Sequence, residues 1–305
     1  MDVGPQFDDR LARSTALRRE GVPVAFMHVP KTAGTSLTHA ISQIAPGGCH
    51  VRGFDRSSFG GFESFDDIPA SMRRLIYLHE KALPADAVTI CGHFSYNTLR
   101  SQYPAAELVT VLREPAARLL SHWTYWRGLT WWELRRWGPV WAERLKLAAL
   151  PLAEFLSHPE IACQTDNIVT RMLVWPEQAV PAAGFIDPHD DARLLHLALA
   201  RLRRFGYVDV VERGEAMMAD FSTWVGAPLA LPRLNETPLL PRRMRTGYQG
   251  TLTPRALALL QQRSRLDVCL WRQVAGRYRW DTPIDLLQEA ARLRAVARCA
   301  LLLAG

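Results

Sequence analysis

Residues 24–41, VAFMHVPKTAGTSLTHAI, constrain the fold of this chain more than any other segment. The apolar run that opens the segment is typical of a buried strand in a parallel sheet. From Ser36 onward the apolar residues follow helical spacing. Because a strand followed directly by a helix is the repeating unit of α/β proteins, the segment predicts an α/β fold with a central, mainly parallel sheet.

The loop between this strand and this helix has the composition of an anion site. Backbone N–H groups and the positive end of the helix dipole converge where a helix begins. Gly34 lets the backbone approach an oxyanion closely, and Lys31 adds charge. Thr32, Thr35 and Ser36 add hydroxyl donors. The alternative is a plain turn with a Ser/Thr helix cap, but a cap needs one hydroxyl and no lysine.

Lysine is rare in this chain, which draws attention to position 31. Of the 37 basic residues only Lys31, Lys81 and Lys146 are lysine. A compact ammonium acts as a point charge, whereas the planar guanidinium of arginine presents a fork of donors. The spacing differs from the Walker A loop, in which the lysine follows the second glycine. Together with the lack of an apolar strand ending in a magnesium-binding Asp, this disfavours a kinase or an ATPase.

The remaining patterns extend the α/β prediction along one domain, 1–305. Strands are predicted at 87–96, 106–115 and 206–212, and helices at 116–126, 131–150, 190–205, 214–226 and 253–278. Residues 51–69, rich in Gly, Ser and Asp, are predicted to form a loop. The domain is expected to carry an N-terminal extension (1–20), a Trp-rich helical insertion (about 116–200) and a C-terminal helical tail (279–305).

Composition indicates the cellular compartment of the chain and the charge of its ligand. No apolar run reaches the ~20 residues of a membrane span, and the polar N-terminus is unlike a signal peptide. Five cysteines without a C-x-x-C pair favour a reducing compartment and no zinc site. Together with the preference for arginine over lysine, these features make us expect a cytoplasmic, bacterial protein that needs no metal. The net charge of +7 suits an anionic ligand. The apolar C-terminal run leaves membrane-surface contact open.

Three segments, taken together, resemble the sulfotransferases that use 3′-phosphoadenosine 5′-phosphosulfate (PAPS). VPKTAGTS (29–36) resembles the loop of that family that binds the 5′-phosphosulfate. VLREPAARLLSHW (111–123) resembles its 3′-phosphate motif, and CGHFSY (91–96) the segment that carries the proposed catalytic base. The nearest resemblance is to the carbohydrate branch that includes heparan sulfate 2-O-sulfotransferase.

The resemblance implies a P-loop-like sulfotransferase fold and a role for each matching residue. It places Lys31, Thr32, Ala33, Gly34, Thr35 and Ser36 at the 5′-phosphosulfate, with Lys31 also catalytic. It places Arg113 and Ser121 at the 3′-phosphate and makes His93 the base. Cys91 stands where the heparan enzymes carry a further His. RRMRTGYQGTLTPR (242–255) resembles the lid over the nucleotide, with Arg245, Gly247 and Tyr248 as contacts.

The residues themselves favour the same ligand. PAPS has a phosphate group at each end of its nucleoside, so a protein needs two anion sites to bind it. The chain offers two strand-to-helix turns, one with Lys31 and one with Arg113 at the carboxyl end of a strand, the edge where α/β sheets bind ligands. A neutral imidazole at His93 suits proton transfer near pH 7. His28 and His39 are expected to be structural, and His122 is a weaker alternative base.

The expected acceptor is a hydroxyl of a carbohydrate or glycoconjugate. The Trp-rich segment 123–144 is interpreted mainly as core packing, with acceptor binding and membrane contact as alternatives. An atypical P-loop kinase remains open as an alternative enzyme. A basic nucleic-acid-binding protein remains open as a non-enzyme, although no RRM, helix-turn-helix or zinc pattern supports it.

Overall fold

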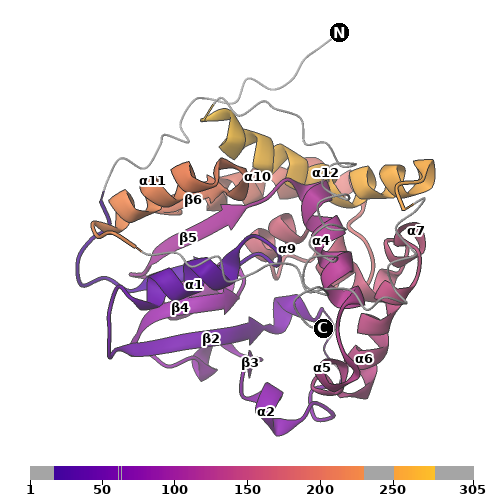
Figure 1. The fold of residues 1–305 in the computed structure, drawn as a ribbon, viewed down its shortest axis with the longest axis horizontal. Coiled ribbons are helices and arrows are strands. Elements are labelled where there is room, and N and C mark those ends of the chain that lie inside the picture. Colours follow the sequence, from indigo (N-terminus) through magenta and orange to yellow (C-terminus); the bar gives the residue numbers. More distant parts are fainter. Residues whose placement is uncertain (1–16, 61, 63, 230–250, 279–305) are drawn as a thin grey trace, which may run out of the picture.

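A computed structural model describes residues 17–60, 62, 64–229 and 251–278 (Figure 1). The predicted lid residues Arg245, Gly247 and Tyr248 lie outside the described residues. So do most of the N-terminal extension and all of the predicted C-terminal tail. No helix among those described is both long and apolar enough to cross a bilayer.

Six parallel strands form the central sheet. They are β1 (Val24–Met27), β2 (Cys49–Asp55), β3 (Ile76–Tyr77), β4 (Ala87–His93), β5 (Glu107–Leu112) and β6 (Tyr207–Val210), in the order β3-β2-β4-β1-β5-β6. Each neighbouring pair runs parallel. The α/β class and its central parallel sheet are therefore confirmed, and the sheet is wholly parallel within the described residues.

Twelve α-helices surround the sheet in the described part of the chain. They are α1 (Gly34–Ser42), α2 (Ala70–Arg73), α3 (Tyr96–Gln102), α4 (Pro115–Arg127), α5 (Trp131–Arg135), α6 (Gly138–Lys146), α7 (Leu152–Phe155), α8 (Ala162–Thr165), α9 (Ile168–Val174), α10 (Asp191–Leu202), α11 (Glu215–Val225) and α12 (Pro254–Gly276). Thr253 caps α12, because its side chain accepts a hydrogen bond from the Ala256 N–H.

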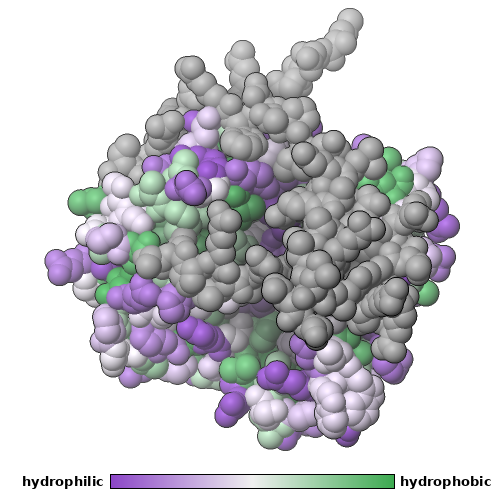
Figure 2. Space-filling model, in the orientation of Figure 1, coloured by the Kyte–Doolittle hydropathy of each residue, from purple (hydrophilic) through white to green (hydrophobic). Residues whose placement is uncertain are grey.

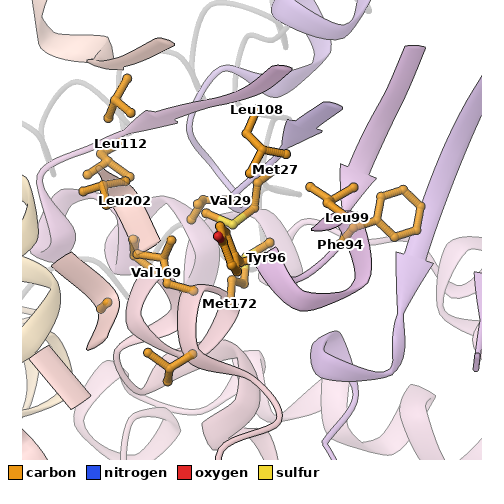
Figure 3. Close-up of a cluster of buried hydrophobic side chains, with 14 of the residues drawn as sticks. Met27, Val29, Phe94, Tyr96, Leu99, Leu108, Leu112, Val169, Met172 and Leu202 are labelled. Carbon is orange, nitrogen blue, oxygen red and sulfur yellow. The ribbon is translucent and has the colours of Figure 1, made fainter. Parts of the chain in front are cut away.

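Two hydrophobic cores hold helices against the faces of the sheet. One core joins β1, β4 and β5 to α3, α9, α10 and α12, and includes Met27, Leu108, Met172 and Leu202 (Figure 3). The other joins β1 and β5 to α1 and α11 on the opposite face. The helices of 168–202 thus pack directly against one face of the sheet.

A third core lies beside the sheet and combines aromatic with aliphatic side chains. It joins α4, α6 and α7 to the segment after β2, and includes Phe59, Trp123, Trp126 and Trp141. Phe59 packs edge-on against Trp141, with ring centroids 5.2 Å apart. The core-packing interpretation therefore holds for these tryptophans.

The predicted loop at 51–69 is wrong in its first part, because residues 49–55 form β2. Exposed and buried residues alternate along this strand, so its polar side chains gave it the composition of a loop. Gly53 has a φ of 149°, and a Cβ there would lie 2.1 Å from the Leu75 carbonyl oxygen. Glycine at this position marks a close approach of two backbones within the sheet.

Candidate active site

Three predicted motifs meet at the carboxyl edge of the sheet. Strand β1 lies between β4 and β5. Lys31 follows β1, His93 ends β4, and Arg113 follows β5 directly. Because parallel strands end at the same edge, residues far apart in the sequence become neighbours there. The site is therefore assembled from three adjacent strand ends.

The turn from β1 to α1 has an unusual backbone. Lys31 has a φ of 70° and Ala33 a φ of 60°, and they are two of the three non-glycine residues with positive φ in the described chain. Such residues cost about 1–3 kcal/mol each and gather at functional sites. Left-handed residues alternating with right-handed ones turn successive N–H groups toward one side, a geometry that binds anions.

The start of α1 carries no side-chain cap. Its N-cap residue is Ala33, and no acidic residue lies in the first turn. The sequence left open a plain turn in which a Ser or Thr side chain caps the helix. The structure does not have such a cap at the start of α1. Thr32 is buried and its hydroxyl donates to the Val29 carbonyl oxygen at 2.9 Å, so this hydroxyl fixes the loop. Ala33 and Thr35 are exposed and Ser36 is half-buried.

His28 lies against the start of α1, and this explains the glycine at position 34. A Cβ on Gly34 would lie 1.8 Å from His28 Nε2. The His28 ring also stacks on Phe26 and lies beside the ring of His93, with centroids 4.4 Å apart. The sequence predicted only a structural role for His28. In the structure His28 lies between the anion loop and the predicted base, His93. His39, in contrast, is exposed and hydrogen bonds to Gln43.

His93 is held in one tautomer by a backbone contact. Its Nδ1 lies 2.7 Å from the His28 carbonyl oxygen. A carbonyl only accepts hydrogen bonds, so Nδ1 carries the proton and Nε2 has the free lone pair of a base. The ring lies between His28 and Phe54, whose centroid is 5.0 Å away. Burial lowers the pKa of His93 to about 4, so the imidazole is neutral at pH 7.

A buried carboxylate fixes the backbone around His93. Asp55, at the end of β2, accepts hydrogen bonds from the Ser95 N–H at 2.6 Å and from the Ser57 N–H and hydroxyl. Ser58 donates to the His93 carbonyl oxygen at 3.0 Å. The end of β2 and the turn after it thereby hold the segment that carries His93.

Lys31 and Arg113 are neighbours in space. Arg113 Nη1 donates to the Lys31 carbonyl oxygen at 3.3 Å. Lys31 Nζ lies 4.1 Å from the centroid of the Tyr125 ring, a cation–π contact from the last turn of α4. Burial, and then the charge of Arg113, lower the pKa of Lys31 to about 8. Lys31 is therefore still mostly protonated at pH 7.

Two carboxylates surround the turn that carries Arg113. Glu114 caps α4 by accepting from the Ala117 N–H at 2.6 Å, and its own N–H donates to Glu212 at 2.8 Å. Trp271 Nε1 donates to the same Glu212 at 3.2 Å. Burial raises the pKa of both Glu114 and Glu212, and Arg113 opposes that rise. The turn after β5 is thus tied to the end of β6 and to α12.

The other predicted residues are buried. Ser121, the predicted partner of Arg113 at the 3′-phosphate, lies in α4 and is 2% exposed, so its hydroxyl faces the interior. His122 is buried against Trp126, with ring centroids 4.5 Å apart. Burial raises the pKa of Cys91 to about 12, so this thiol stays protonated. Among the described residues no group of three or more His, Cys, Asp or Glu side chains is placed to hold a metal ion.

Sequence reasoning missed His28, Asp55 and Tyr125. His28 had a usable signal, because it stands one residue after β1 and so at the same sheet edge as Lys31. Asp55 lies in the segment 51–69, which was expected to be a loop at a site, but its role at the end of a strand was not predicted. The contact of Tyr125 depends on the packing of α4 against the β1–α1 turn, which no local pattern encodes.

A scan against models of protein families and a search of curated proteins both found no match.

Proposed function

We propose that this protein is a PAPS-dependent sulfotransferase that transfers a sulfuryl group to a hydroxyl of a carbohydrate or glycoconjugate. The observation that carries the proposal is the meeting of Lys31, His93 and Arg113 at three adjacent strand ends. The proposal includes the sulfotransferase version of the P-loop-like layout, a cytoplasmic bacterial setting and a reaction that needs no metal.

The chemistry of the donors supports a ligand with two anionic groups. One group fits the start of α1, an uncapped helix that begins three residues after Lys31. The other fits Arg113, whose guanidinium can hold a phosphate by two hydrogen bonds. Because Arg113 contacts the Lys31 backbone, one ligand that carries both anionic groups can reach both residues.

In the proposed reaction His93 acts as the base and Lys31 as the electrostatic partner. The acceptor hydroxyl gives its proton to His93 Nε2 while its oxygen bonds to sulfur. On the opposite side of the sulfur, the bond to the oxygen of the 5′-phosphate breaks and adenosine 3′,5′-bisphosphate leaves. Lys31 and the N–H groups of the α1 turn stabilise the negative charge that grows on that oxygen.

Transfer of radiolabelled sulfate from PAPS to a panel of glycans and metabolites tests the proposal. We expect Lys31→Ala and His93→Ala each to abolish transfer. Lys31→Ala also weakens binding of adenosine 3′,5′-bisphosphate, whereas His93→Ala leaves it intact. Lys81→Ala and His189→Ala are matched controls, because both side chains are exposed and lie in other segments. Near-normal turnover in His93→Ala removes the base from the mechanism.

The role of Arg113 is tested with a second nucleotide that lacks the 3′-phosphate. Arg113→Ala is expected to weaken PAPS at least tenfold more than adenosine 5′-phosphosulfate, since a charged hydrogen bond contributes about 1.5–3 kcal/mol. Arg203→Ala, at an exposed position after α10, is the control. Equal losses for the two nucleotides contradict a 3′-phosphate contact.

A further inference from the structure

Two tryptophans of the Trp-rich segment are not part of any core. Trp131 and Trp132 are 56% and 72% exposed, whereas Trp123, Trp126 and Trp141 are buried. No residue of α5, which carries the two exposed rings, is buried. In Figure 2 the surface over α5, at the lower right, is pale, the shade of side chains of intermediate hydropathy. Burying such large rings on folding would stabilise the protein, so their exposure needs another explanation.

The two rings are held in a defined arrangement. Their centroids are 4.8 Å apart and their planes meet at 75°. The Arg135 guanidinium lies 4.4 Å from the centroid of Trp131. A capping box fixes the start of α5: the Thr130 N–H donates to Glu133 at 2.7 Å, and the Glu133 N–H donates back to the Thr130 hydroxyl. The rings therefore form a preorganised corner.

This corner belongs to the same region as the candidate active site. Tyr125, whose ring contacts Lys31, is 37% exposed. Burial raises the pKa of Tyr125, the Glu133 carboxylate adds to the rise and Arg136 opposes it. Tyr125 lies in the last turn of α4, and α5 begins four residues after α4 ends. Arg136 is the C-cap residue of α5 and stands four residues after Trp132, so the two side chains lie on the same side of the helix. Tyr125 thus links Lys31 to the chain segment that leads directly into α5.

We propose that Trp131 and Trp132 form a docking platform for a saccharide chain whose reacting hydroxyl lies at His93, an inference that rests on the proposed function. Flat aromatic faces stack on the C–H faces of sugar rings, and the arginines beside them supply donors for sugar oxygens. Two rings at a steep angle fit a puckered sugar better than the plane of a bilayer. The Arg135 charge on Trp131 also opposes insertion into hydrocarbon.

Direct binding to the full chain tests the platform independently of catalysis. Cellohexaose, chitohexaose and hexagalacturonate are titrated by calorimetry into the protein, Trp131→Ala, Trp132→Ala and the control Leu257→Ala, an exposed apolar residue of α12. We expect at least one hexasaccharide to bind. Each tryptophan variant weakens that binding about five- to tenfold, as the loss of one aromatic contact predicts. The shift in melting temperature caused by adenosine 3′,5′-bisphosphate stays unchanged.

Three results overturn the platform: no hexasaccharide binds, the tryptophan variants bind as well as the control, or the tryptophans support sedimentation with phosphatidylglycerol vesicles instead. Failure of the proposed function gives a different pattern. Saccharide binding that depends on the tryptophans, without any transfer from PAPS, rejects the sulfotransferase and retains the docking surface. Transfer that proceeds at equal KM for the acceptor in all variants retains the sulfotransferase and rejects the platform.

Discussion

Burial lowers the pKa of His93 to about 4 and the pKa of Lys31 to about 8, so the two values lie on either side of neutrality. A base must be unprotonated, so activity rises with pH through the pKa of His93. The ammonium must be protonated, so activity falls as pH rises through the pKa of Lys31. We therefore expect kcat/KM for the nucleotide to be bell-shaped, with limbs near pH 4 and pH 8.

Lys31→Arg separates the two limbs. Its guanidinium stays protonated, so the variant is expected to be slower but to lose the alkaline limb. The same profile measured as kcat should have both limbs at higher pH, because a bound anion favours the protonated forms of both side chains. Circular dichroism at each pH checks that the protein is folded. An alkaline limb that persists near pH 8 in Lys31→Arg assigns that limb to another group.

At the scale of single residues, the sequence showed which side chains carry charge but not how they are held. Lys31, His93 and Arg113 were found from their motifs, and their places at strand ends are confirmed. The tautomer of His93 depends on the backbone of His28, and its segment depends on Asp55 from a strand that was not predicted. These contacts join positions far apart in the sequence, so no local pattern contains them.

At the scale of elements, the β1–α1 turn couples the anion loop to the base through His28. Gly34→Ala places a Cβ 1.8 Å from His28 Nε2, so the ring must move and its stacking with His93 is disturbed. We expect this variant to lose about 1–3 kcal/mol of unfolding free energy, as overpacked sites do. Its transfer activity should fall at least tenfold.

Removing the His28 side chain relieves the clash with a Cβ at position 34, so a double variant tests this contact. The double variant His28→Ala/Gly34→Ala is expected to be more stable than additivity of the two single variants predicts, by roughly 0.5–3 kcal/mol. Urea unfolding measures all four members of this cycle. Gly276→Ala, where a Cβ meets nothing within 4 Å, is the control for a glycine change in a helix. Strict additivity contradicts the proposed contact.

The strands that were predicted and those that were not differ in burial. Strands β1, β4, β5 and β6 are largely buried, so their apolar runs are visible in the sequence. Strand β2 exposes alternate residues and β3 has only two residues, so neither carries a continuous apolar signal. The short helices α7 and α8 have four residues each, fewer than a helical period needs to be recognised.

At the scale of the whole molecule, the order of strands creates the site. The chain passes from β4 to β5 across β1, so the turns after β1 and β5 lie side by side although a long segment of sequence separates them. The order β3-β2-β4-β1-β5-β6 cannot be deduced from the strands alone, because the same elements allow other orders. A nucleotide that bridges Lys31 and Arg113 must therefore restrain both turns at once.

Hydrogen exchange with and without adenosine 3′,5′-bisphosphate tests this bridging. We expect amide exchange to slow together in peptides covering 31–36 and 113–117, because one ligand closes the local opening of both turns. Exchange in α11, which packs in the core with α1 but carries none of the predicted site residues, should be unchanged. Arg113→Ala should abolish protection at 113–117 and weaken it at 31–36, since loss of one contact lowers the occupancy of the whole ligand. Protection confined to one turn in the unmodified protein would mean that the two basic groups bind separate ligands, and a nucleotide with phosphates at both ends would no longer explain the site.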